Sequence, residues 1–152
     1  MTRGNARELA VHLIYGREFT GDEPEEVVAA RLDKDYYGKL ATENQVYTER
    51  PNRAQRAYID LVVTGVASRT EELNAYIQNY SIGWDVTRIS KLARTVMQLA
   101  IFEILNLDDV PTGVAISEAV RIVKMYDGDE TSAFVNGILG AFARSLNTEV
   151  TQ

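Results

Sequence analysis

Apolar residues recur at intervals of three and four positions along most of the chain, the spacing that places side chains on one face of an α-helix. The alternation of apolar and polar residues that is typical of a half-buried strand extends over no useful length. The pattern therefore predicts an all-α fold, a helical bundle of six or seven helices. The expected helices span residues 5–19, about 26–32, 53–68, 70–80, 86 or 87 to 105, 114–126 and 130–146.

We expect one domain over residues 1–152, with an N-terminal half at 1–80 and a C-terminal half at 81–150 that pack together on either side of the break at Ser81–Gly83. In the second half, the segment VMQLAIFEIL is apolar on nearly all sides. A helix of that kind has to be surrounded by other helices, so it should be the central one. Its Glu103 would be a buried carboxylate, for which a structural role is favoured over a catalytic one.

The stretch from Pro111 to Gly140 holds two helix patterns, separated by the turn-forming triplet Asp127-Gly128-Asp129. Asp129 or Thr131 could cap the second helix, as Thr70 could cap the helix at 70–80. The tetrapeptide FVNG lies in the first turns of the second helix. It places an amide and a glycine where a merely packed helix would favour Ala or Leu, which predicts the close approach of another group.

The segment 33–52 shows no clean period and contains Tyr36, Tyr37 and Tyr47. We expect a variable connection with at most one helical turn. The tyrosine rings could stack on nucleic-acid bases, but rings that cover a neighbouring helix are the favoured interpretation.

Composition narrows the class of protein. The net charge is -6, yet residues 1–17 carry three basic side chains and one acidic one, so a small basic patch on an acidic body is compatible with the sequence. The chain has no cysteine, no segment apolar enough to span a membrane and no convincing secretory leader. We expect a cytoplasmic protein without membrane contact.

The residues of a catalytic centre are missing from the pattern. The single histidine, His12, has no second histidine or cysteine to share a metal, and the acidic residues at 127–130 lack the spacing of a calcium loop. No glycine-rich phosphate loop occurs. The sequence therefore predicts a binding module that is not an enzyme and that needs no cofactor and no metal.

Three segments resemble the NusB family of transcription antitermination factors. PTGVAISEAV, followed by Lys124 and then FVNGIL, carries the strongest likeness. ARELAVHLIYG resembles the first helix of the family, and Trp84 followed by RISKLARTVMQLAIFEI resembles its central helix. The likeness covers roughly the first twenty and the last seventy residues, and it is weak between them.

The resemblance implies a small all-helical protein that binds the single-stranded boxA segment of nascent RNA, pairs with the ribosomal protein NusE and joins an RNA polymerase antitermination complex. Such RNA is read by arginine contacts to phosphate and by aromatic stacking on bases. It implies RNA binding by Arg3, Arg7, His12, Tyr15, Glu130, Ser132 and Phe134. It implies partner binding by Tyr80, Arg88 and Lys91.

The chain departs from the family pattern at positions that concern charge. Gly4 and Asn5 interrupt the usual arginine run, Ala133 stands where a lysine is common, and Ala93 stands where an acid is usual near the NusE face. These losses leave an alternative open, a protein-interaction scaffold of the same fold, homodimeric or partner-binding, with weak or lost RNA affinity. The methyltransferase fusions in which this domain also occurs would need a further α/β domain, which these 152 residues do not contain.

Overall fold

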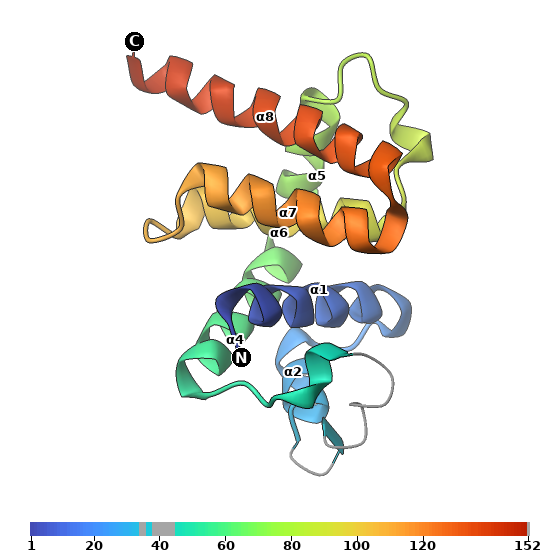
Figure 1. Cartoon of the computed structure of the whole chain (residues 1–152), viewed down its shortest axis with the longest axis vertical. Helices are drawn as coiled ribbons and strands as arrows, with labels where there is room; N and C mark the ends of the chain where they lie inside the picture. Colours follow the sequence, from blue (N-terminus) through green and yellow to red (C-terminus); the bar gives the residue numbers. More distant parts are fainter. Residues whose placement is uncertain (34–35, 38–44, 152) are drawn as a thin grey trace. The chain divides into compact units, whose positions relative to one another are not determined.

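The computed structural model describes residues 1–33, 36–37 and 45–151, and no strand occurs among them. This confirms the all-α class. The helices are α1 (Arg3–Thr20), α2 (Pro24–Arg31), α4 (Arg53–Ser68), α5 (Thr70–Asn79), α6 (Lys91–Asn106), α7 (Thr112–Asp127) and α8 (Asp129–Thr151), with 3₁₀ turns η2 (Gln45–Thr48) and η3 (Val86–Arg88) (Figure 1). They divide into two compact units, Met1–Ser68 and Arg69–Gln152. The division thus lies before α5, whereas the sequence suggests it at Ser81–Gly83.

In the first unit, α4 packs against both α1 and α2. The apolar stripe expected on α1 is buried, and the facing stripe of α4 supplies Ile59, Val62, Val63 and Val66. Arg3 is also used in this packing, because its guanidinium carbon lies 4.4 Å from the centre of the Tyr58 ring on α4. A cation over an aromatic face stabilises the contact electrostatically.

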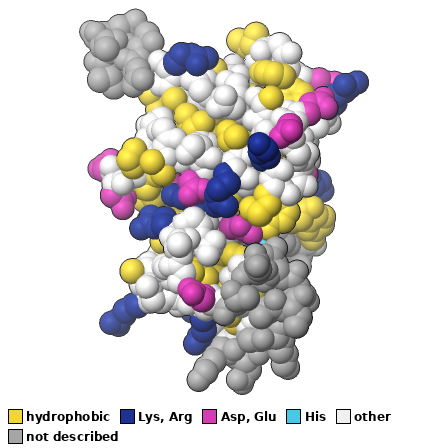
Figure 2. Space-filling model, in the orientation of Figure 1, with side chains coloured by type: hydrophobic (Ala, Val, Ile, Leu, Met, Phe, Trp, Pro, Cys, Tyr) yellow, Lys and Arg dark blue, Asp and Glu magenta, His cyan; other side chains and the backbone are white. Residues whose placement is uncertain are grey.

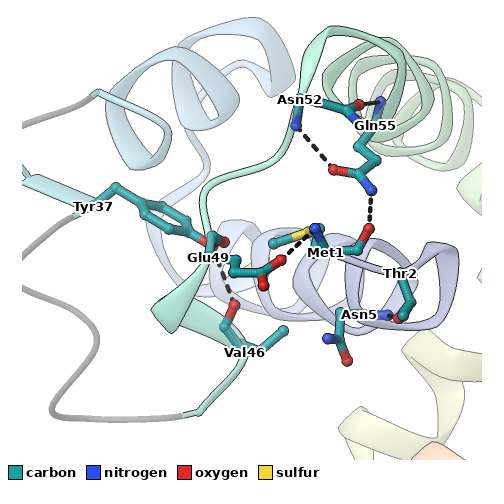
Figure 3. Close-up of polar contacts among 8 residues, drawn as sticks. All are labelled: Met1, Thr2, Asn5, Tyr37, Val46, Glu49, Asn52 and Gln55. Carbon is teal, nitrogen blue, oxygen red and sulfur yellow. Dashed lines mark hydrogen bonds and ion pairs between the residues drawn. The ribbon is translucent and has the colours of Figure 1, made fainter.

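The segment around η2 covers one side of α1. Tyr37 and Tyr47 are buried and meet edge to face, with their ring centroids 5.6 Å apart. The Tyr37 hydroxyl donates to the carbonyl oxygens of Val46 and Glu49 (Figure 3). These two rings therefore have the covering role that the sequence favours, whereas Tyr36 is exposed. Residues 34–35 and 38–44 of the expected variable connection lie outside the described residues.

The chain start is held against the same region. The Met1 amino group lies 2.5 Å from a carboxylate oxygen of Glu49, and the Met1 carbonyl accepts a hydrogen bond from the Gln55 side chain on α4 (Figure 3). The amino group lowers the pKa of the Glu49 carboxyl, chiefly through a hydrogen bond to its charged form. Asn52 and Gln55 cap the first turn of α4 by exchanging two hydrogen bonds of 2.9 Å.

In the second unit, α6 contacts α5, α7 and α8 (Figure 1). Its residues from Thr95 to Glu103 are all buried, which confirms it as the central helix of this unit. Glu103 is completely buried, as expected. The buried Gln98 donates to the Asn74 side chain on α5 at 2.8 Å, so that a polar pair is satisfied inside an apolar contact.

The start of α6 and the helix caps differ from the expectations. We expected α6 to begin at residue 86 or 87, but residues 86–88 form a 3₁₀ turn capped by Asp85 and α6 begins at Lys91. The physical reason is Ser90, whose hydroxyl accepts from the Ala93 N–H at 3.0 Å and donates to Asp127 at the end of α7 at 2.6 Å. The expected caps were also wrong, since Thr70 is the first residue of α5, and Asp129 and Thr131 lie inside α8.

Gly128 joins α7 to α8 with φ 88° and ψ −173°, a backbone conformation that essentially only glycine adopts. This conformation lets α8 begin directly after α7 ends, with no linker residue between them other than Gly128. We predict that Gly128→Ala lowers the free energy of unfolding by about 1 to 3 kcal/mol, measured by urea denaturation.

Gly113 is the matched control, because it lies in the first turn of α7 with ordinary φ and open space where a Cβ would project. Gly113→Ala should leave stability unchanged or raise it by up to about 1 kcal/mol. Equal effects of the two substitutions would contradict the role assigned to Gly128.

Candidate nucleic-acid interface

The α1 residues assigned to RNA binding have different environments. Arg3 is exposed but lies over Tyr58, and Arg7 is only 4% exposed and has interactions of its own. One helical turn thus separates an exposed cation from a buried one. Tyr15 is half-buried and meets the exposed Phe19 edge to face at 5.1 Å.

His12 belongs to a polar group on the side of α1 that η2 covers. Its Nδ1 lies 2.9 Å from the Tyr47 hydroxyl, and its Nε2 lies 3.9 Å from a carboxylate oxygen of Glu8. Burial lowers the pKa of His12, the negative charge of Glu8 raises it and the positive charge of Arg31 lowers it further. The imidazole is therefore a packed, neutral hydrogen-bonding group near neutral pH.

The second set of assigned residues lies at the start of α8. Glu130 is exposed in the first turn, whereas Ser132 is buried and its hydroxyl donates to the Asp129 carbonyl at 2.8 Å. Phe134 is half-buried, and its ring meets Trp84 edge to face with the centroids 4.4 Å apart. Of the three, Glu130 and Phe134 have surface to offer a ligand.

Trp84 reaches Phe134 because Gly137 has no side chain. A Cβ built on Gly137 would lie 3.1 Å from Trp84 Cζ2 and 3.4 Å from its Nε1. The glycine of FVNG thus allows the indole to lie flush against α8, which is the close approach that the sequence predicts. Trp84 is 38% exposed, so the Trp84–Phe134 pair presents an aromatic edge to solvent.

The residues assigned to partner binding lie in the segment on either side of Trp84. Tyr80 follows α5, and its ring meets the buried Phe142 of α8 at 5.8 Å. The Arg88 side chain is 79% exposed and lies 3.6 Å from Asp85, and Lys91 is exposed at the first turn of α6. Within the second unit, Trp84 therefore connects the assigned RNA residues at the start of α8 with the assigned partner residues at 80–91.

Sequence reasoning placed Trp84 in the central-helix likeness but did not select it as a site residue. Its role depends on contacts with residues fifty or more positions away, and the only local signal was the unusual FVNG tetrapeptide. Two further residues that the selection missed, Arg17 and Arg31, line a cavity in the first unit together with His12. Neither arginine belongs to a motif or shares a short spacing with the other.

Charged side chains of both signs are interspersed with hydrophobic ones on the face shown in Figure 2. Among the described residues, no three His, Asp or Glu side chains gather closely enough to hold a metal ion, and no helix is long and apolar enough to cross a membrane. What the described residues offer a ligand is exposed aromatic edges, exposed cations and the cavity lined by Arg17 and Arg31.

These features define a small all-helical protein whose aromatic and charged surface residues suit it to binding. The family model described as the NusB family matches residues 4–144. The chain belongs to the NusB family. Its relatives include transcription antitermination protein NusB of Acetivibrio thermocellus, 39% identical over 92% of this chain and 87% of the relative, and that of Natranaerobius thermophilus, 35% identical over 97% and 98%.

Solved structures share the fold. NusB of T. maritima superposes with a TM-score of 0.76 at 25% identity, over 95% of this chain and 92% of that one. A chain of a crystal structure of the antitermination factors NusB and NusE in complex with dsRNA superposes with a TM-score of 0.71 at 22% identity, over 94% and 96%.

The environment of His12 predicts a pH dependence of stability. Because its pKa is lowered from 6.5 in the folded state, the unfolded chain binds more protons below that pH, and stability falls as the pH decreases from about 6.5. The variant His12→Gln should lose less stability than the parent between about pH 7.5 and about pH 5.5, measured by urea denaturation. Identical losses would refute this account of the imidazole.

The Trp84–Gly137 contact predicts a spectroscopic effect. Gly137→Ala should displace the indole by a few tenths of an ångström and change the emission of Trp84, which is the only tryptophan of the chain. Gly140→Ala, on the same helix, meets only the flexible end of Arg144 and should leave the emission unchanged. If both variants emit like the parent, the indole does not lie against α8 as described.

Proposed function

We propose that the chain is a transcription antitermination factor that binds boxA-type single-stranded RNA together with NusE and supports RNA polymerase on ribosomal RNA operons in the cytoplasm. Membership of the NusB family and the name shared by its relatives support this role. The observation that carries it in the structure is the Trp84–Phe134 pair, a partly exposed aromatic edge at the start of α8. Stacking on aromatic rings is a main source of affinity for unpaired bases.

The proposed surface for NusE lies next to the Trp84–Phe134 pair. We assign contacts with NusE to Tyr80, Arg88 and Lys91, which flank Trp84 along the chain. Tyr80 and Trp84 both pack on α8, so RNA bound at Phe134 and a protein bound at 80–91 would contact neighbouring parts of the second unit. If the two bind cooperatively, each must tighten the binding of the other by the same factor.

The cationic contribution should be small. The Arg3 guanidinium lies over the Tyr58 ring, Arg7 is buried, and Ala133 supplies no charge beside Phe134. Since each phosphate contact adds to the salt dependence of the association constant, we expect a shallow dependence and a binding energy dominated by stacking.

The packing of Arg3 and the burial of Arg7 favour a second candidate function. If Arg3 and Arg7 serve only the packing of α1, the chain could act as a protein-interaction scaffold, homodimeric or bound to a partner, with little RNA affinity. The two candidates differ in what Arg3→Ala does. Under the first, this substitution weakens RNA binding without weakening NusE binding, whereas under the second it leaves the weak or absent RNA affinity unchanged.

The deciding experiment is a titration of labelled boxA-type RNA and of a scrambled RNA at low salt, with and without NusE, followed by fluorescence anisotropy. Phe134→Ala should weaken boxA binding by about 1 to 3 kcal/mol, the worth of one stacked base. Tyr36→Ala removes an exposed ring from the other unit and is the matched control, expected to bind as the parent does.

Equal affinity for boxA and scrambled RNA in the presence of NusE would overturn the first candidate. Retained NusE binding in that case would support the second.

A further inference from the structure

A cavity lies between α1 and α2 within the first unit, and the proposed RNA function does not account for it. Its volume is about 110 Å³. The apolar part of the lining comes from Leu13, Val27 and Ala30, and the polar part comes from His12, Arg17, Thr20, Asp22 and Arg31. Two guanidinium groups and an imidazole thus face one small space that contains a single carboxylate.

Neither guanidinium is neutralised within the described residues. Arg17 and Arg31 form no ion pair there, and Asp22 is exposed and forms none either. Burial is the main cause of the lowered pKa of His12, and Glu8, which raises this pKa, acts more strongly than Arg31, which lowers it. Within the lining itself, two guanidinium charges face the single carboxylate of Asp22.

Arg17 shows the need for an acceptor most directly. Its Nε is the one buried side-chain nitrogen or oxygen among the described residues that has no hydrogen-bond partner. A buried donor without a partner costs free energy, more so when it is charged, and native structures contain few of them. An acceptor oxygen supplied from outside the chain would remove this cost.

The helix dipole does not remove the free-energy cost of the unpartnered Arg17 Nε. Arg17 and Arg31 lie in the last turns of α1 and α2, where a cation is favoured. That explains the presence of a positive charge at both places. It supplies no oxygen to the buried Arg17 Nε, and it does not explain why both arginines face the same cavity.

Size and geometry limit the ligand. At about 30 Å³ for each water, the cavity has room for about three to four waters, close to the size of a tetrahedral anion with four oxygens. A guanidinium donates in a planar fork that matches the oxygens of a phosphate. Gly16 also lines this space, and a Cβ there would lie 3.9 Å from Arg31 Nη2, an ordinary van der Waals distance.

We propose that the cavity between α1 and α2 is a binding site for one phosphate group, held by Arg17 and Arg31. The site lies on residues other than Phe134 and Trp84, and it does not depend on boxA binding. The phosphate can belong to a free phosphate or mononucleotide, or to the backbone of an RNA. The chemistry of the site is the same in each case.

The test is an NMR titration of the full chain labelled with ¹⁵N, which follows the Nε–H of Arg17 and the backbone amide of Gly16. The probes are inorganic phosphate, adenosine 5′-monophosphate and a short single-stranded RNA with a 5′-hydroxyl, each compared with sodium chloride at equal ionic strength. We expect saturable shifts of both resonances with at least one phosphate probe. Shifts with phosphate or the nucleotide alone identify a free ligand, and shifts with the RNA identify its backbone.

Two variants and a control make the result specific. Arg17→Gln and Arg31→Gln should each weaken binding roughly tenfold or more, as expected for the loss of a hydrogen bond to a charged group. Arg53→Gln removes the same charge from an exposed position of α4 outside the cavity and should bind as the parent does. Thermal unfolding of each variant checks the fold, and Arg31→Gln alone carries the test if Arg17→Gln does not fold.

The proposal is overturned if no phosphate probe shifts the two resonances beyond sodium chloride. It is overturned equally if Arg31→Gln and Arg53→Gln bind alike. A loss of boxA binding in Phe134→Ala together with unchanged phosphate binding would show that the two sites are separate.

Discussion

The contact of Trp84 with α8 is the constraint on which the functional account depends. The indole lies against Gly137 and meets Phe134 edge to face, so a loop residue and the first turns of a helix form one surface. The helix start is itself fixed, because Gly128 joins α7 to α8 and Ser90 ties the start of α6 to the end of α7. The exposed aromatic edge is therefore held by the packing of the second unit and does not depend on a mobile side chain.

Much of the fold could be predicted from the sequence, because the apolar positions of α1, α4 and α6 repeat with a clear helical period and α6 is apolar on nearly all sides. The caps of α5 and α8 and the start of α6 could not, since a cap depends on which of several neighbouring Ser, Thr and Asp residues adopts an extended backbone. Ser90 caps α6, and its hydroxyl also donates a hydrogen bond to Asp127, which lies far away in the sequence.

The candidate site could be predicted only in part, because it too depends on contacts between residues that are far apart in the sequence. The FVNG turn indicated close approach, but the residue that approaches, Trp84, could be identified only from the structure. The cations were harder to predict. Arg3 and Arg7 are one turn apart in the sequence pattern, yet one lies over Tyr58 and the other is buried, whereas Arg17 and Arg31 share a cavity that no spacing indicates. Of the three arginines in the basic segment 1–17, only Arg17 lines this cavity.

The central claim is that an unpaired base stacks on the aromatic edge formed by Phe134 and Trp84. The most direct measurement is isotope-filtered NMR on a saturated complex of the chain with NusE and boxA-type RNA, which detects contacts between protein ring protons and base protons. The account predicts intermolecular contacts from the Phe134 ring to at least one base. A saturated complex in which neither Phe134 nor Trp84 contacts a base would contradict it.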